Sequence, residues 1–326
     1  MKLILRYTLL FTFLFTSNSC EFLFHRIHNP KPIAKDKNVI ENSSDLNESG
    51  ELRFIAIGDW GEKGKFFQKD VALAMQKIEL GEQINFILTL GDNFYPNGVK
   101  SISDSHFKES FEDIYQFSKP ILWYITLGNH DYMGDIQALV DYGNKNPNWI
   151  FSHTYYSFEK KISEKENAFF VVTDTNEFVD ILGFLNYRSY MRNEKGKTQL
   201  DWMEDKLKSS KAKWKIVVGH HPIYSAGAHG DTKVLQKEFL EILEKNNVNL
   251  YLAGHEHDLQ YLKHPDKKIH FFISGGGSKI RELKSSPYTV FAASQAGFAV
   301  ITINEKSINL RFINESGKQI YETTIQ

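Results

Sequence analysis

The sequence has 326 residues, of which 41% are hydrophobic, and a formal net charge of −1 at pH 7. Apolar side chains in this proportion, including 25 phenylalanines, can bury a sizeable core, which excludes an intrinsically disordered protein. The balanced charge excludes the basic excess expected of a nucleic-acid-binding protein. The single cysteine excludes both a disulfide within the chain and a zinc–thiolate site.

The first twenty residues have the layout of a bacterial lipoprotein signal. Lys2 and Arg6 precede a mostly apolar run at 7–15, which is too short for a permanent membrane-spanning helix. Small and polar residues follow, and the segment ends at Cys20. We expect residues 1–20 to direct export, with a lipidated Cys20 anchoring the chain to a bacterial membrane, facing the periplasm or the surface. A cleaved signal and a secreted protein are the alternative.

Residues 21–50 are polar and show no periodicity, which is typical of a flexible linker. A linker of this length spans about 30 Å on average, enough to lift a folded domain off a membrane. Residues 51–326 contain no repeat and no second domain boundary. We expect them to form one catalytic domain, near the upper size for a single core.

Short, nearly continuous apolar runs alternate with amphipathic segments from Leu52 onward. Such runs predict strands buried on both faces; they lie at 52–58, 84–91, 121–128, 168–175, 214–220 and 249–255. Two intervening segments place apolar side chains on one helical face: 198–208 and 231–246. Three C-terminal segments predict antiparallel hairpins: 268–276, 297–314 and 318–325. The pattern indicates an α/β core followed by a β-rich end, packed in layers.

Five of these six strands are followed by potential metal ligands behind a glycine. The five groups are Gly58-Asp59-Trp60-Gly61, Gly91-Asp92-Asn93-Phe94-Tyr95, Gly128-Asn129-His130-Asp131, Gly219-His220-His221-Pro222 and Gly254-His255-Glu256-His257. In open α/β sheets, ligands bind beyond the carboxyl ends of the strands, and glycine allows the chain to approach an ion closely. A single group of this kind is usually an ordinary turn or a satisfied polar residue, but five in succession are hard to explain in that way.

Two pairs of residues in these groups favour bound metal. Asp59 and Asp92, on adjacent core strands, would place two negative charges together in a low dielectric, which is costly unless a cation neutralises them. His255 and His257 are two residues apart, so in an extended chain their side chains lie on the same face. Both can therefore reach one metal centre, or one metal each of a close pair.

The order of the five groups resembles that of the purple acid phosphatases of the metallophosphoesterase superfamily. The segments GDWG, LGDNFYPNGV, GNHDYMGD, VVGHHPIYSAGAHG and YLAGHEHDLQYL are similar to those of the small, tartrate-resistant (type 5) acid phosphatases, over about residues 52–280. The resemblance implies a layered α/β/β/α sandwich that forms a single catalytic domain. It also implies a hydrolase of phosphate monoesters, an acid phosphatase. The wider superfamily commonly has a histidine two residues after the first aspartate; here Gly61 stands there, and Tyr95 follows the second aspartate.

A phenolate is a hard, anionic oxygen donor, which suits Fe3+ better than a borderline-soft divalent ion. By resemblance, the ligands of the iron are Asp59, Asp92, Tyr95 and His257. By the same resemblance, the ligands of a second, divalent metal (iron, zinc or manganese) are Asp92, Asn129, His220 and His255. Asp92 then bridges the two ions.

The resemblance also implies a mechanism. Two close cations clamp a phosphate ester and lower the pKa of a bound water, and the resulting metal-bound hydroxide attacks phosphorus. His130 and His229 border the substrate, and one or both protonate the leaving oxygen, which fits an acidic optimum. Asp131 orients His130. The alternative for His229 is a loop histidine without a catalytic part, and His221 matches no ligand position of the family.

Three alternatives stay open. Another metallophosphoesterase (a nucleotidase, phosphodiesterase or protein phosphatase) would share the metal chemistry and differ in its pocket. A lipid-anchored surface binding protein with little catalysis should have lost ligands, whereas every expected ligand position is filled. An iron pair can also undergo redox cycling, and no feature of the sequence favours or excludes a redox function. The expected substrates are phosphorylated small molecules or phosphoproteins, and the expected state is a monomer.

Overall fold

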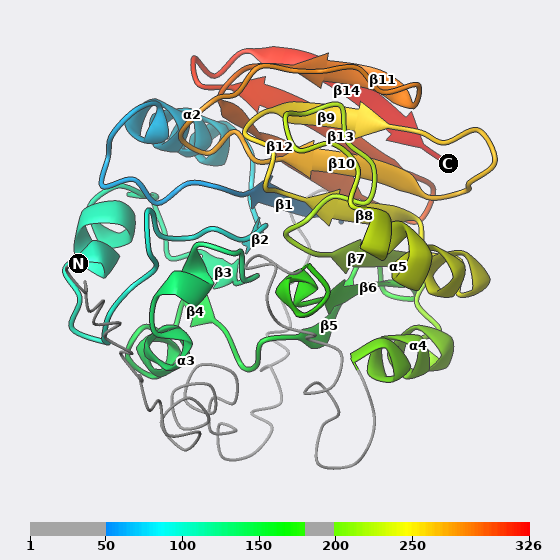
Figure 1. Cartoon of the computed structure of the whole chain (residues 1–326), viewed down its shortest axis with the longest axis horizontal. Helices are drawn as coiled ribbons and strands as arrows, with labels where there is room; N and C mark the ends of the chain where they lie inside the picture. Colours follow the sequence, from blue (N-terminus) through cyan, green and yellow to red (C-terminus); the bar gives the residue numbers. More distant parts are fainter. Residues whose placement is uncertain (1–49, 180–198) are drawn as a thin grey trace, which may run out of the picture.

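The structure is a computed structural model that describes residues 50–179 and 199–326. The predicted lipoprotein signal at 1–20 and almost all of the predicted linker at 21–50 lie outside the described residues. Two seven-stranded sheets pack face to face, and helices cover the two outer sides (Figure 1). These four layers confirm the predicted α/β/β/α sandwich.

The first sheet has the strand order β14-β13-β12-β1-β2-β3-β4. Its parallel strands are β1 (Leu52–Ile57), β2 (Phe86–Thr89), β3 (Leu122–Tyr124) and β4 (Trp149–Ile150). Its antiparallel strands are β12 (Gly297–Ile303), β13 (Ile308–Asn314) and β14 (Gln319–Ile325). The predicted C-terminal hairpins therefore exist, and they extend the first sheet on the free side of β1.

The second sheet has the order β11-β9-β10-β8-β7-β6-β5. Its strands are β5 (Tyr156–Lys161), β6 (Asn167–Val172), β7 (Trp214–Val218), β8 (Leu250–Ala253), β9 (Leu259–Leu262), β10 (His270–Ser274) and β11 (Thr289–Ala293). The antiparallel pairing predicted for 268–276 is confirmed, because β10 pairs antiparallel with β9; β10 also pairs parallel with β8, which the hairpin prediction did not include. Residues 271–274 are buried, as expected for a strand that continues the parallel part of the sheet.

Four helices form the outer layers: α2 (Gln68–Gly81), α3 (Ile136–Lys145), α4 (Gln199–Ser209) and α5 (Lys233–Lys245). α2 packs on β12 and β13 and α3 on β4, whereas α4 packs on β6 and on α5. Three short helical turns complete the described elements: η1 (Lys108–Glu112), η2 (Asp131–Met133) and η3 (Thr175–Glu177). The predicted helices at 198–208 and 231–246 correspond to α4 and α5. None of the helices of residues 50–179 and 199–326 is long and apolar enough to cross a membrane.

Aromatic side chains fill the space between the sheets. Phe170 of the second sheet lies with its ring 5.5 Å from that of Phe54 and 5.6 Å from that of Phe86, both of the first sheet. All three side chains are fully buried, and burying each contributes roughly 1.5–3 kcal/mol. This packing fixes the strand ends of the two sheets relative to each other.

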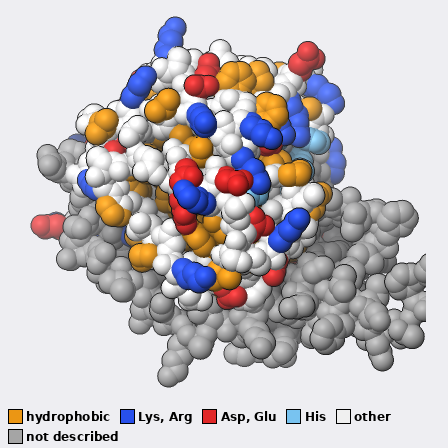
Figure 2. Space-filling view, turned by 90° about the vertical axis from the view of Figure 1, so that its left-hand side faces the viewer, with side chains coloured by type: hydrophobic (Ala, Val, Ile, Leu, Met, Phe, Trp, Pro, Cys, Tyr) orange, Lys and Arg blue, Asp and Glu red, His pale blue; other side chains and the backbone are white. Residues whose placement is uncertain are grey.

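The face drawn in Figure 2 carries both basic and acidic side chains, scattered among polar and hydrophobic ones. This distribution agrees with the balanced net charge of −1.

Candidate metal centre

Loops from both sheets meet at the carboxyl ends of their parallel strands. Asp59 follows β1, Asp92 follows β2 and Asn129 follows β3, which are neighbours in the first sheet. His220 follows β7 and His255 follows β8, which are neighbours in the second. The backbone joins the two sheets here, since Gly58 N–H donates to Ser274 O at 2.8 Å. The predicted ligands therefore converge from five loops.

Three of these residues have a strained backbone. Asp59, Asp92 and His255 have φ angles of 60°, 51° and 68°, in the left-handed region that residues with a side chain seldom occupy. Such strain costs on the order of 1–3 kcal/mol per residue and persists where the surrounding structure imposes it, typically at functional sites. The packing thus holds these three side chains in the cluster at a local cost in stability.

Oxygen atoms dominate one half of the cluster. Tyr95 Oη lies 2.8 Å from Asp59 Oδ1 and 2.8 Å from Asp92 Oδ2. His257 Nε2 lies 3.2 Å from Tyr95 Oη and 3.4 Å from Asp59 Oδ1. All four side chains are buried. A phenol has one proton and cannot donate it to two carboxylates at once, so this arrangement favours a cation among the oxygens.

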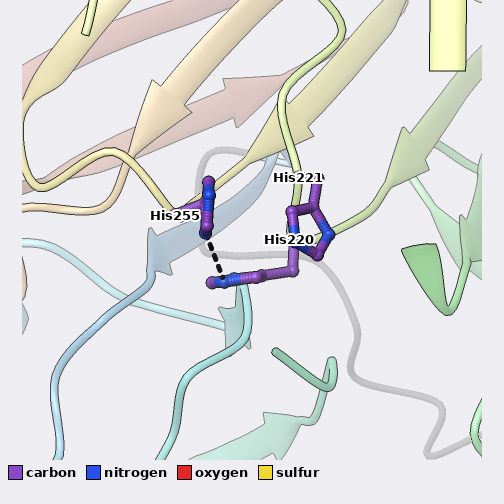
Figure 3. Close-up of side chains that lie close together, drawn as sticks. All are labelled: His220, His221 and His255. Atoms are coloured by element: carbon purple, nitrogen blue, oxygen red, sulfur yellow. Dashed lines mark hydrogen bonds between the residues drawn. The ribbon is translucent and has the colours of Figure 1, made fainter. Parts of the chain in front are cut away.

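Imidazole nitrogens dominate the other half. His220 Nε2 lies 3.2 Å from His255 Nδ1 (Figure 3). The same Nε2 lies 3.1 Å from Asn129 Oδ1 and 3.4 Å from Asp92 Oδ2. The other ring nitrogen, Nδ1, lies 2.8 Å from Leu90 O and donates to it, which leaves the lone pair on Nε2 available to a metal ion. Asp92 Oδ2 faces both halves of the cluster and so has the position of a bridging ligand.

The residues present fit a pair of metal ions. Burial raises the pKa of Asp59. Burial also acts to raise the pKa of Asp92, but the interactions of this carboxylate with His220 and His130 outweigh burial, so the pKa of Asp92 is lowered. Two buried carboxylates side by side are costly when ionised unless a cation neutralises them. Two groups of three residues each place their potential ligand atoms within 4.8 Å of one another. One group is Asp59, Asp92 and His220, and the other is His220, His221 and His255.

His221 lies beside the cluster, although it matches no ligand position of the family. Its ring is buried and lies 4.5 Å from that of His255 (Figure 3). Its Nδ1 lies 2.9 Å from Thr175 Oγ1. Thr175 and Asp174 follow β6, the one predicted parallel strand for which no ligand group was recognised. Asp174 is fully buried, and this burial raises its pKa to about 6. An Asp-Thr pair after an apolar run was the available signal.

The loop after β3 places His130 against the oxygen-rich half. Its backbone N–H donates to Asp92 Oδ1 at 2.7 Å. Its ring lies 4.4 Å from the ring of Tyr95, and its Nδ1 contacts Pro96 O. The structure therefore places His130 at the edge of the cluster, with Nε2 as the nitrogen that does not face Pro96.

Asp131 is fully buried and contacts backbone N–H groups and the Asn93 side chain, not a histidine ring. Its carboxylate accepts hydrogen bonds from Gly128 N at 2.9 Å, Asn93 N at 3.0 Å and Asn93 Nδ2 at 2.8 Å. Among the described residues, no hydrogen bond joins it to the His130 ring. Asp131 thus ties the loops after β2 and β3 together, and any orienting effect on His130 runs through this backbone.

His229 reaches the cluster from the loop after β7. Its side chain is 46% exposed, and its ring lies 4.3 Å from the ring of His255. Its Nδ1 lies 3.1 Å from Glu256 Oε2, whereas Arg281 Nη1 lies 3.4 Å from Nδ1 and 3.1 Å from His255 O. Sequence reasoning missed Glu256 and Arg281. The position of Glu256 between two predicted ligands was the only signal for it, and Arg281 had none.

Two packed mixed sheets with buried carboxylate, phenol and imidazole groups at their strand ends define the class of layered metallophosphoesterases. Residues 52–259 match the calcineurin-like phosphoesterase family. The chain is 38% identical over 293 residues to purple acid phosphatase 4 of Arabidopsis thaliana, covering 85% of this chain and 84% of the relative. The chain therefore belongs to the purple acid phosphatases of the calcineurin-like phosphoesterase family, and it is a hydrolase homologous to acid phosphatases.

Two further comparisons agree with this assignment. The chain is 32% identical over 295 residues to tartrate-resistant acid phosphatase type 5 of Rattus norvegicus, covering 84% of this chain and 90% of the relative. The solved structure of GAP50, the anchor in the inner membrane complex of Plasmodium, superposes with a TM-score of 0.75 at 25% identity, covering 85% of this chain and 89% of that one. The resemblance inferred from the motifs and the predicted fold are thus confirmed, and the family implies a two-metal site.

Proposed function

We propose that the chain is a two-metal acid phosphatase that hydrolyses phosphate monoesters. The observation that carries this proposal is the position of Asp92. Its Oδ2 lies 2.8 Å from Tyr95 Oη and 3.4 Å from His220 Nε2, so that one carboxylate is shared by an oxygen-rich and a nitrogen-rich half-site. Membership of the purple acid phosphatases supports the reaction class.

The oxygen-rich half suits Fe3+, because a phenolate and carboxylates are hard, anionic donors. Its proposed ligands are Asp59, Asp92, Tyr95 and His257. The other half suits a divalent iron, zinc or manganese ion, with proposed ligands Asp92, Asn129, His220 and His255. When bound, such a pair supplies the positive charge that holds a phosphate ester and activates the attacking water.

The surrounding residues supply the remaining chemistry. The backbone N–H group of His130 donates a hydrogen bond to Asp92 Oδ1, which holds this carboxylate in place between the half-sites. His229, with its partly exposed ring beside His255, donates a proton to the leaving oxygen. A histidine that must carry this proton favours turnover at acidic pH. His130 borders the phosphoryl group on the Tyr95 side of the cluster.

The substrates proposed are phosphorylated small molecules or phosphoproteins. The test compares kcat/KM of the metal-loaded protein for phenyl phosphate, diphenyl phosphate, a nucleotide and a phosphopeptide between pH 4 and pH 8. We expect the monoesters to be hydrolysed fastest, with the highest rates below pH 7. A preference for the diester would assign the chain to another metallophosphoesterase activity. Absence of turnover with both metals bound would favour a binding protein.

His229 has its own test. His229→Ala should lower kcat for an alkyl phosphate by roughly 100-fold, a typical effect of losing a general acid. The metal content should stay unchanged. Full activity in this variant would remove His229 from the catalytic residues.

We propose further that the chain is exported and anchored through a lipidated Cys20. The support is the sequence layout, in which a short apolar run and four small or polar residues precede the only cysteine. Radioactive palmitate should label the full chain and not Cys20→Ser, and the substitution should move phosphatase activity out of the membrane fraction. If the substitution does not change the distribution of phosphatase activity between the membrane and soluble fractions, the lipid anchor is contradicted, and a cleaved signal remains as the explanation of the N-terminal sequence.

Gel filtration of the detergent-solubilised protein tests the proposed monomeric state.

A further inference from the structure

Glu256 is a fully buried carboxylate that lies in sequence between His255 and His257. It contacts the loop formed by residues 225–230, which carries His229. Glu256 Oε1 accepts three hydrogen bonds: from Ser225 Oγ at 3.0 Å, His229 N at 2.9 Å and Gly230 N at 3.0 Å. A buried carboxylate with this many donors is held rigidly, because the hydrogen bonds would have to break before the carboxylate could move.

The loop contacts this carboxylate closely. A side chain at Gly227 would place its Cβ 2.4 Å from Glu256 Cδ, well inside van der Waals contact. The Gly227 N–H in turn donates to Ser225 Oγ at 2.8 Å, which orients the hydroxyl toward Glu256. The loop is therefore shaped around the carboxylate.

The second carboxylate oxygen contacts the imidazole. Oε2 of Glu256 lies 3.1 Å from His229 Nδ1, while Oε1 of the same group holds the His229 backbone N–H. One side chain thus restrains both the backbone and the ring of His229. Arg281 Nη1 also lies 3.4 Å from Nδ1, but it is a donor and has His255 O as its acceptor at 3.1 Å. Glu256 is therefore the acceptor for an Nδ1–H group.

We propose that Glu256 is a positioning residue that fixes the ring orientation and tautomer of His229, so that Nε2 is the nitrogen that faces the leaving group. The inference rests on the proposed function. As the bond from phosphorus to the leaving oxygen breaks, the proton on Nε2 passes to that oxygen. His229 is left neutral, with its Nδ1–H still donated to Glu256.

The test uses Glu256→Gln, which keeps the size and shape of the side chain. The amide has one oxygen and one NH₂ group, so it cannot accept hydrogen bonds at both of the positions that the two carboxylate oxygens occupy. Removing a positioned proton donor slows alkyl esters, whose leaving oxygen needs a proton, more than activated aryl esters. We expect kcat to fall about tenfold or more for glycerol phosphate. For p-nitrophenyl phosphate it should fall less than about threefold, with KM and metal content within error of the parent protein. Ser225→Ala is the matched control. It removes a neutral hydrogen bond to the same carboxylate without contacting the ring, and should show no leaving-group dependence.

A double-mutant cycle separates positioning from structure. If Glu256 acts through His229, the variant Glu256→Gln/His229→Ala should turn over glycerol phosphate no more slowly than His229→Ala alone. Losses that multiply, an equal loss for both esters, or loss of metal would overturn the inference.

The proposed function and this inference fail in different ways. If His229→Ala is slow and Glu256→Gln is normal, only the positioning role of Glu256 is wrong. If His229→Ala itself retains full activity, the proton-donor role in the proposed function is wrong, and the positioning role is overturned with it.

Discussion

Tyr95 Oη lies 2.8 Å from Asp59 Oδ1, although the two residues follow different strands and are 36 positions apart. Burial raises the pKa of Tyr95 well above its ordinary value, and the Asp59 and Asp92 carboxylates raise it further. Without a cation the phenol therefore keeps its proton and donates it to a carboxylate. A trivalent ion among these oxygens would reverse that preference and stabilise the phenolate, because the ion carries the largest local charge in the site.

Substitution of Asp92 should affect both half-sites at once. Asp92→Ala removes a side chain whose Oδ2 faces both Tyr95 Oη and His220 Nε2. We expect both metals to be lost and kcat to fall by more than about 100-fold, since even outer-shell substitutions at metal sites cost 10- to 100-fold. Elemental analysis and phosphatase assays measure the two effects. An active variant with two metals per chain would refute the bridging role.

Substitution of Tyr95 tests the identity of the ion in the oxygen-rich half. A phenolate bound to Fe3+ gives a visible charge-transfer band, so Tyr95→Phe should abolish this colour. The ring position is buried, at 5% exposure, and the fold should tolerate the loss of one hydroxyl. The measurement is the absorption spectrum of iron-loaded protein. A band of unchanged position and intensity would show that the phenolate is not an iron ligand.

Gly128 should be intolerant of a side chain. A Cβ at this position would lie 2.2 Å from both the backbone N and Oδ1 of Asp92. Gly128→Ala should destabilise the protein by on the order of 1–3 kcal/mol and weaken metal binding, because Asp92 must shift. Chemical denaturation and metal titration measure these effects.

Gly81 provides the control for that substitution. A Cβ at Gly81, the last residue of α2, would meet no atom within 4 Å. Gly81→Ala should therefore be neutral or stabilising by up to about 1 kcal/mol, through helix propensity. Equal destabilisation by the two substitutions would contradict the proposed clash at Asp92.

His270 should make stability depend on pH in the acidic range. Partial burial and the nearby Lys263 lower the pKa of His270 from 6.5 to about 4. Between these values the unfolded chain binds more protons than the folded chain, so the His270 contribution to stability declines as pH falls from 6.5 to 4. His270→Asn should flatten the pH dependence of the urea midpoint in this window. An unchanged slope would show that His270 does not titrate differently on folding.

The sequence was sufficient for the features that depend on local pattern. Apolar runs closed by glycine and a polar ligand predicted the parallel strands and the loops that carry Asp59, Asp92 and His220. The same reasoning located α4 and α5, whose apolar residues recur at helical spacing. It did not single out α2, whose buried face includes the small Ala72 and Ala74 and therefore gives a weak apolar stripe.

Features that depend on tertiary contact were not predictable from pattern. β10 forms the expected antiparallel pair with β9, but the sequence of a strand does not show that it has a second, parallel neighbour, which here is β8. Glu256 reaches His229 across 27 residues, and Thr175 reaches His221 across 46. These contacts form only when the pairing of β6, β7 and β8 in the second sheet brings the loops that follow these strands together.

The most direct test of a metal pair bridged by Asp92 is anomalous X-ray diffraction, at the iron and zinc edges, from a crystal of protein grown with both metals. We expect two ions in contact with Asp92, an iron with Tyr95 as a ligand and a zinc with His220 as a ligand. A single ion, or ions bound away from these residues, would contradict the bridged pair.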